Sequence, residues 1–315
     1  MEACSPLVGK GGQHPVSVWE SGLASVVIPA YNAERTICAT VKSVLGQTYR
    51  PIEVIVVDDG SQDHTSDAVA RFTGSVQLLR GPNSGAAAAR NRGIDNAHGE
   101  FVAFLDADDL WESDKLARQI AFLNGHPEIG AVQSGARFVD DEMRTLEVQR
   151  CVVGGDALAD ALRFRNLPAF PSALVIRHTC LKDLGGFDTS LVILEDWDMA
   201  IRAARHCRLA SLAEPLVLYR VHGGNRSRNI DIHITPGLSV LRRLYRQRDL
   251  PSSIARDRRE IYATFYRMLA GGYFRARRPG AFARWALRAL VTDPAQILYM
   301  LALPARFVRR KRSAR

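Results

Sequence analysis

Two aspartates, Asp106 and Asp108, stand one residue apart directly after the apolar stretch 101–105. On a turn that follows a strand, their carboxylate oxygens can bind the same ion. Hard oxygen ligands suit Mg²⁺ or Mn²⁺ better than zinc, and such a cation commonly bridges protein carboxylates and phosphate oxygens. This spacing is also frequent by chance, so the metal-site hypothesis depends on what surrounds the two residues.

A second pair of acids, Asp58 and Asp59, comes directly after another apolar stretch, residues 52–57. Open α/β sheets bind their ligands outside the carboxyl ends of the strands. Aspartate is also common in ordinary turns, which is the structural alternative. Two acidic strand ends in one series of strands and helices favour a shared binding crevice.

Glu195 and Asp196 precede a predicted helix whose apolar face includes Trp197 and Ile201. A hydroxyl group is a poor nucleophile until its proton is accepted, so a carboxylate here could serve as a general base. Acids are also favoured in the first turn of any helix by the helix dipole, and this gives a purely structural alternative.

Short, β-branched, apolar stretches predict the strands that position these acids: residues 25–29, 52–57, 76–79 and 101–105. Helical spacing predicts helices after Asn32, near Asp63 and near Gly85, with Asn32 as the cap of the first. The alternation of strand and helix is typical of an α/β fold with a mostly parallel, Rossmann-like sheet flanked by helices.

Bulk composition narrows the class of protein. The 315 residues are 47% hydrophobic and 24% charged, as in ordinary globular proteins. The five cysteines are scattered without a CxxC pair, so neither a disulfide framework nor a zinc site is indicated. Residues 1–22 are predicted to be a flexible segment without a signal peptide. No apolar run reaches the length of about 18 residues that a membrane span needs. A cytoplasmic location is the expectation.

Charge is distributed unevenly along the chain. Residues 241–315 contain 19 Lys plus Arg and 4 Asp plus Glu, a net charge of +15, so the remaining residues carry 23 − 29 = −6. This region is predicted to be helical, and it suggests an anionic partner such as the inner face of a membrane. Packing of its apolar face on the rest of the protein is the alternative. The apolar face and the basic cluster that motivate the hypothesis are Phe282, Trp285, Ala286, Ala289 and Leu290, and Arg306, Arg309, Arg310, Lys311 and Arg312.

The order of these segments resembles that of family 2 glycosyltransferases. The segments that carry the resemblance are SVVIPAYN (25–32), VVDDGS (56–61), GAAAARNRG (85–93), FLDADD (104–109), GGFD (185–188), the acids at 195–196 and YRVH (219–222). The resemblance covers about residues 23–229. It implies a GT-A fold, a nucleotide-diphosphate-sugar donor, a divalent cation (Mg²⁺ or Mn²⁺), and inversion at the anomeric carbon.

On the donor side, the resemblance assigns roles to seven residues. They are Pro29, Ala30, Tyr31, Asp58, Asp59, Arg90 and Asp106. One aspartate of the first acidic pair contacts the nucleotide base, with Asp58 favoured over Asp59. Arg90 reaches the nucleotide, or is alternatively a solvated charge on a helix. Asp106 contacts the ribose or the metal.

For the metal and the acceptor, the resemblance makes Asp108 the direct metal ligand and Asp109 a turn or capping residue. His222 completes the metal shell or reaches the diphosphate, although a lone histidine is often structural. Asp196 matches the base that removes the acceptor proton, and Glu195 positions the acceptor.

The sequence thus predicts three regions: a flexible segment (1–22), a catalytic domain (23–230) and a helical, Arg-rich extension (231–315). The catalytic domain divides into a nucleotide-sugar half (about 23–110) and an acceptor half (about 111–230). The expected partners are the donor and a saccharide or lipid-linked saccharide, as in bacterial-type polysaccharide or glycolipid assembly. An inactive nucleotide-sugar or lipid binding protein is the alternative. No nucleic-acid-binding motif and no Gly-rich, basic pyrophosphorylase loop occurs.

Overall fold

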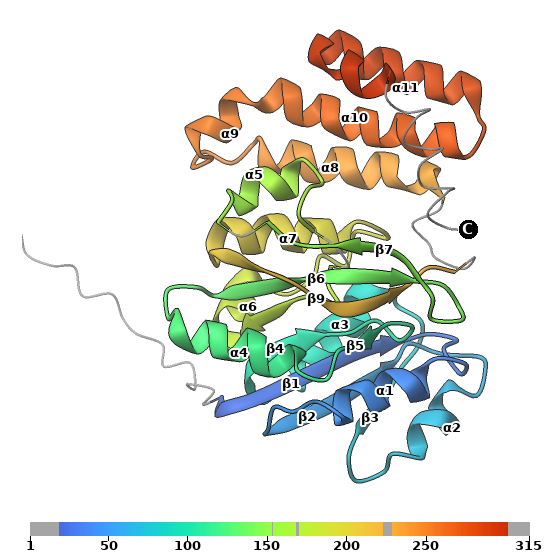
Figure 1. Cartoon of the computed structure of the whole chain (residues 1–315), viewed down its shortest axis with the longest axis vertical. Coiled ribbons are helices and arrows are strands. Elements are labelled where there is room, and N and C mark those ends of the chain that lie inside the picture. The colour runs from blue at the N-terminus through green and yellow to red at the C-terminus, as the bar shows by residue number, and fades with distance from the viewer. Residues whose placement is uncertain (1–18, 153, 168–169, 223–228, 302–315) are drawn as a thin grey trace, which may run out of the picture.

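The computed structural model describes residues 19–152, 154–167, 170–222 and 229–301 (Figure 1). Within this part of the chain, nine strands form one sheet in the order β3-β2-β1-β4-β8-β6-β9-β5, with β7 paired to β6. Figure 1 shows helices α8 to α11 stacked at one end of the molecule, with α11 outermost. Residues 1–18 of the predicted flexible segment and the basic cluster from Arg306 to Arg312 lie outside the described residues.

The bounds of the elements are as follows. The strands are β1 Glu20–Ala30, β2 Ile52–Asp58, β3 Gln77–Arg80, β4 Gly99–Phe104, β5 Leu110–Trp111, β6 Ala131–Val139, β7 Thr145–Gln149, β8 Val175–Arg177 and β9 Leu209–Arg220. The helices are α1 Ile37–Leu45, α2 Thr65–Ala70, α3 Ala86–Asp95, α4 Lys115–Gly125, α5 Ala157–Leu162, α6 His178–Leu184, α7 Glu195–His206, α8 Ile234–Leu244, α9 Ser252–Arg256, α10 Arg258–Arg275 and α11 Pro279–Thr292.

The first four strands confirm the predicted alternation of strand and helix. Strand β1 pairs in parallel with β2 and β4, and β2 pairs in parallel with β3. Their carboxyl ends therefore meet at one edge of the sheet, which brings the two acidic pairs of the sequence to the same edge. Beyond β4 the sheet becomes mixed, because β8 runs antiparallel to both β4 and β6.

The predicted helix cap at Asn32 is wrong. Helix α1 begins at Ile37 after Thr36, and Asn32 lies in the left-handed region with φ 50°. Its side-chain oxygen instead accepts a hydrogen bond of 2.8 Å from the backbone N–H of Gln62. Asn32 therefore joins the loop after β1 to the loop after β2, and both loops border the carboxyl edge of the sheet.

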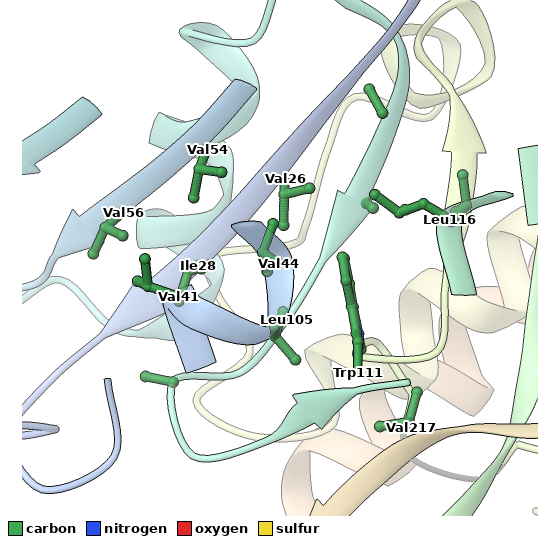
Figure 2. Close-up of a cluster of buried hydrophobic side chains, with 14 of the residues drawn as sticks. Val26, Ile28, Val41, Val44, Val54, Val56, Leu105, Trp111, Leu116 and Val217 are labelled. Atoms are coloured by element: carbon green, nitrogen blue, oxygen red, sulfur yellow. The ribbon is translucent and has the colours of Figure 1, made fainter. Parts of the chain in front are cut away.

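Alternate side chains of β1 enter two hydrophobic cores, one on each face of the sheet. Val26 and Ile28 pack with α1 and α4 on one face, as Figure 2 shows for Val41, Val44 and Leu116. Val27 enters the core on the other face, which includes buried residues of α3, α6 and α7. This two-sided burial is typical of parallel strands covered by helices.

A third hydrophobic core joins α7 to the C-terminal helices. Trp197 and Ile201 of α7 pack in it with Leu241 of α8, Phe265 of α10 and Trp285 of α11. Hydrophobic contacts thus cross the predicted boundary at residue 230. The helices after this boundary form part of the packing around α7.

The face of α11 that the sequence suggested for membrane contact is buried in the protein. Trp285 and Ala289 are 4% and 0% exposed, and Phe282 and Ala286 pack against the same core. The alternative of packing on the rest of the protein is therefore correct for this face. In the described residues, no helix combines the length and hydrophobicity needed to span a bilayer.

Candidate active site

Asp109 anchors the acidic loop after β4. It is buried, and its two carboxylate oxygens accept hydrogen bonds from the Ser172 hydroxyl (2.7 Å) and the Arg220 backbone N–H (3.0 Å). The Ser172 hydroxyl oxygen also accepts a bond from the backbone N–H of Asp106. Asp109 has the turn role expected for it, and its contacts hold Asp106 and Asp108 at the edge of the sheet.

His222 lies next to Asp108, although 114 positions separate them in sequence. Its Nε2 is 2.8 Å from Oδ2 of Asp108, and both side chains are partly exposed. The Arg220 side chain also donates to the backbone carbonyl of Asp108. The segment that follows β9 thus places the imidazole of His222 beside Asp108, the residue expected to bind the metal directly.

Arg90 connects the acidic loop after β4 with the start of α7. Its guanidinium donates to Asp106 at 2.6 Å and to Glu195 at 3.0 Å, and it lies 5.2 Å from the ring centroid of Phe187. The side chain is 5% exposed, so the alternative of a solvated helix charge is wrong. Arg90 thus bridges a carboxylate of the loop after β4 and a carboxylate at the start of α7.

Close packing of α3 on β1 places Arg90 in this position. A Cβ atom at Gly93 would lie 2.2 Å from a methyl carbon of Val27, a distance that real side chains do not tolerate. Glycine therefore permits the helix to approach the strand, and Arg90 points from α3 into the space between the two carboxylates.

Glu195 and Asp196 do not precede the helix but form the beginning of its first turn, since α7 starts at Glu195. Burial and the neighbouring Glu195 carboxylate raise the pKa of Asp196 to about 7, and the Arg90 guanidinium opposes the shift. A carboxylate with a pKa near neutrality is suited to accept a proton from a hydroxyl group, because both of its protonation states are accessible at neutral pH.

Asp58 and Asp59 lie at the carboxyl edge of β2 and hold the surrounding loops. The carboxylate of Asp58 accepts bonds from the Ser61 backbone N–H (2.9 Å) and from the Ser66 hydroxyl. Both oxygens of Asp59 accept backbone N–H bonds at 2.8 Å, from Ser84 and Gly85. The two carboxylates thus shape the expected nucleotide pocket through its loops.

The loop after β1 lies beside this acidic pair. Ala30 pairs with Asp58 across the parallel strands, and the carbonyl of Ala30 accepts the backbone N–H of Asp59. Pro29 and Ala30 end β1, and the following Tyr31 is 47% exposed. An exposed aromatic ring at this edge can stack on a planar ligand.

The oxygen and nitrogen atoms of this site suit a hard divalent cation. In the described residues, however, they do not supply a complete set of protein ligands for it. In the described ranges, no three His, Cys, Asp or Glu side chains lie together in a way that could hold a metal ion. Asp108 and His222 do lie together, with Asp106 two residues away. Carboxylate oxygen and imidazole nitrogen are compatible with Mn²⁺, and a site with few protein ligands leaves positions for phosphate oxygens.

Sequence reasoning missed Ser172. Its hydroxyl joins Asp106 to Asp109, and its carbonyl accepts the indole N–H of Trp111. A single serine far from the acidic loop carries no local pattern that marks it. A cavity of about 500 Å³ lies elsewhere, beside α1 and α2, and none of the expected site residues lines it.

One protein-family model matches half of the chain. Residues 25–183 match the model of glycosyl transferase family 2. A UDP-Glc:α-D-GlcNAc-diphosphoundecaprenol β-1,3-glucosyltransferase (WfgD) of Escherichia coli is 47% identical over 103 residues, or 32% of this chain and 41% of that protein. An uncharacterized glycosyltransferase of Nostoc is 31% identical over 64% of this chain and 65% of that protein. The chain thus covers less than two thirds of either relative.

Solved structures share the fold at low identity. TarS 1–349 of S. aureus, in complex with UDP-GlcNAc, matches 85% of this chain and 79% of that chain, with a TM-score of 0.62 and 20% identity. The mannosyltransferase PcManGT of Pyrobaculum calidifontis, in complex with GDP-Man and Mn²⁺, matches 92% and 81%, with a TM-score of 0.60 and 23% identity. These similarities show the GT-A fold that the sequence predicted.

Proposed function

This chain belongs to glycosyl transferase family 2, and we propose that it transfers a sugar from a nucleotide-diphosphate donor to an acceptor hydroxyl with inversion at the anomeric carbon. The observation that carries the proposal is the Arg90 bridge. It ties Asp106, at the edge that binds ligands, to Glu195, which stands beside Asp196. Donor and acceptor would therefore meet between these carboxylates.

The reaction needs one proton transfer and one displacement. Asp196 accepts the proton of the acceptor hydroxyl while the hydroxyl oxygen forms a bond to the anomeric carbon. The bond between that carbon and the diphosphate oxygen breaks, and the nucleoside diphosphate leaves with the bonding electrons. Attack from the face opposite the diphosphate inverts the configuration. Arg90 holds Glu195 in place to orient the acceptor.

The cation in this proposal is Mg²⁺ or Mn²⁺, which would be held by Asp108 and His222 with Asp106 beside them. When bound, it neutralises negative charge on the diphosphate leaving group. Asp58 and Asp59 hold the nucleotide pocket, with Pro29, Ala30 and Tyr31 along the base. PcManGT in complex with GDP-Man and Mn²⁺ and TarS in complex with UDP-GlcNAc share this fold, which supports a divalent cation and a nucleotide sugar as the ligands.

The proposed acceptor is a lipid-linked saccharide in bacterial polysaccharide or glycolipid assembly. The E. coli relative is named for transfer to a GlcNAc-diphosphoundecaprenol, and another similar protein is named a putative teichuronic acid biosynthesis glycosyltransferase. A lipid-linked acceptor would place the enzyme at the cytoplasmic face of a membrane.

Binding of the donor should raise the thermal stability of the protein, because a ligand that binds only the folded state stabilises it. We expect one class of nucleotide-diphosphate sugar to raise the melting temperature, and to do so more strongly with Mn²⁺. The measurement is a thermal-shift screen of nucleotide sugars with and without Mn²⁺, followed by a transfer assay. The matching nucleoside monophosphates are the control. Stabilisation without transfer to any lipid-linked saccharide would favour the binding-protein alternative.

For membrane contact we propose a different face of α11 from the one that the sequence suggested, namely its exposed outer face. Leu287 and Val291 are 63% and 76% exposed. Arg284 and Arg288 lie on the same side of the helix by their spacing and are also exposed. Exposed apolar side chains bordered by arginines match a surface of anionic lipid, into which the apolar groups insert while the arginines meet the headgroups.

Replacing Leu287 and Val291 together with glutamine should weaken binding to anionic liposomes, because the apolar contact is lost while the charge stays the same. The measurement is flotation with liposomes of phosphatidylglycerol and phosphatidylcholine. The control is the double Val148→Gln/Val152→Gln variant, which changes two valines that are exposed elsewhere. Equal flotation of the two double variants, or none by the unaltered chain, would rule out this surface.

A further inference from the structure

Arg243 of helix α8 forms ion pairs that connect α8 to the start of α7. Arg243 donates to Asp188 at 2.5 Å and also to the carboxylate of Asp198, which lies in the first turn of α7. The side chain of Asp198 is only 4% exposed. Its other oxygen accepts from Arg202 at 2.7 Å. Arg243 therefore compensates a buried negative charge two residues after Asp196.

Hydrophobic contacts hold the same turn from the same side. Leu194, the residue before α7, is buried in a left-handed conformation with φ 66°, which a non-glycine residue adopts only when its surroundings fix it. Gly237 of α8 lies against it: a Cβ atom there would come within 3.2 Å of Leu194 and within 2.2 Å of Phe265. Helix α8 thus contacts the residue that sets the direction of α7.

Aromatic packing completes this support one residue after Asp196. Trp197 stacks on Phe164 with ring centroids 4.4 Å apart, and lies nearly parallel to Phe265 of α10 at 6.1 Å. Its indole N–H donates to the carbonyl of Ala161 at 2.8 Å. The residues on both sides of Glu195 and Asp196 are therefore fixed by elements from outside the parallel half of the sheet.

We infer that Arg243 is a positioning residue for the transfer reaction, which holds the first turn of α7 so that Asp196 faces the acceptor hydroxyl. The inference rests on the proposed role of Asp196 as base. It gives the C-terminal helices a part in the reaction, since α8 supplies an arginine that pairs with the buried Asp198 and holds it in place. In this inference Arg243 acts through the turn that it holds and not through contact with a substrate.

The test compares Arg243→Met with Arg242→Met, which removes the neighbouring exposed arginine of the same helix. A small displacement of a catalytic group costs much of the rate, so we expect Arg243→Met to lower kcat about tenfold or more, with the donor Kd within about twofold. Arg243→Lys should recover most of kcat, because it restores a positive charge near Asp198. Arg242→Met should leave both quantities unchanged.

A double Asp196→Asn/Arg243→Met variant separates this inference from the proposed function. If Arg243 acts through Asp196, the double variant should lose little more activity than Asp196→Asn alone. Full activity of Asp196→Asn would overturn the proposed base whatever Arg243 does. An inactive Asp196→Asn, together with equal kcat for Arg243→Met and Arg242→Met, would overturn the positioning role alone. A parallel fall of kcat and of folded fraction in Arg243→Met, without recovery by lysine, would also overturn it.

Discussion

Asp196→Asn is expected to lower turnover by about 10²- to 10⁴-fold, the range for loss of a general base. The amide keeps the shape of the carboxylate but cannot accept the acceptor proton. Donor affinity should be retained, because the base is needed only in the transition state. The measurement is kcat with saturating donor and acceptor, together with the donor Kd from binding of the unreacted nucleotide sugar.

The pH dependence of kcat in the unaltered enzyme is a second test of the role of Asp196. A base must be ionised to act, and burial with the nearby Glu195 raises the pKa of Asp196 to about 7. We therefore expect kcat to fall by about tenfold per pH unit below about pH 7, and to be constant above it. In Asp196→Asn this acidic limb should disappear from the residual rate.

The matched control is Asp183→Asn, in which an exposed carboxylate on α6 becomes an amide. It should leave turnover and its pH profile unchanged. If donor binding by Asp196→Asn collapses together with turnover, Asp196 is a donor ligand or a structural residue, and the base must be sought elsewhere.

Asp108→Asn should reduce transfer by about 10²- to 10³-fold, the size expected when one group that stabilises leaving-group charge is removed. The substitution takes away one negative charge at the proposed cation site. The fold should remain intact, because the buried anchor of this loop is Asp109, which keeps its bonds to Ser172 and Arg220. The measurement is initial rate as a function of Mn²⁺ or Mg²⁺ concentration.

Asp183→Asn, the exposed acid on α6, is again the control and should behave like the unaltered enzyme. The unaltered enzyme should lose transfer in EDTA and regain it when excess Mn²⁺ is added. Full activity of Asp108→Asn, or undiminished activity of the unaltered enzyme in EDTA, would remove the metal from the proposal.

The sequence by itself determined the parallel half of the sheet and the edge at which the acids lie. Apolar, β-branched stretches followed by helical spacing are local signals, and each was enough to place its own element within a few residues. Because parallel strands end at one edge, the positions of Asp58 and Asp106 after their strands already implied a common crevice. The order of motifs then identified the family, which the family model confirms.

Only the tertiary structure decided which distant groups meet. His222 reaches Asp108, and Arg90 reaches Glu195 across 105 positions, because strands and helices far apart in sequence pack side by side. No local periodicity encodes such a pairing.

The tertiary structure also decided which side of α11 faces solvent. An amphipathic helix has the same sequence pattern whether its apolar side meets lipid or protein. The structure buries Trp285 and Ala289 and leaves Leu287 exposed, because α10 offers a complementary apolar surface to the first pair. That choice depends on the shape of the neighbouring helix, which the sequence of α11 does not contain.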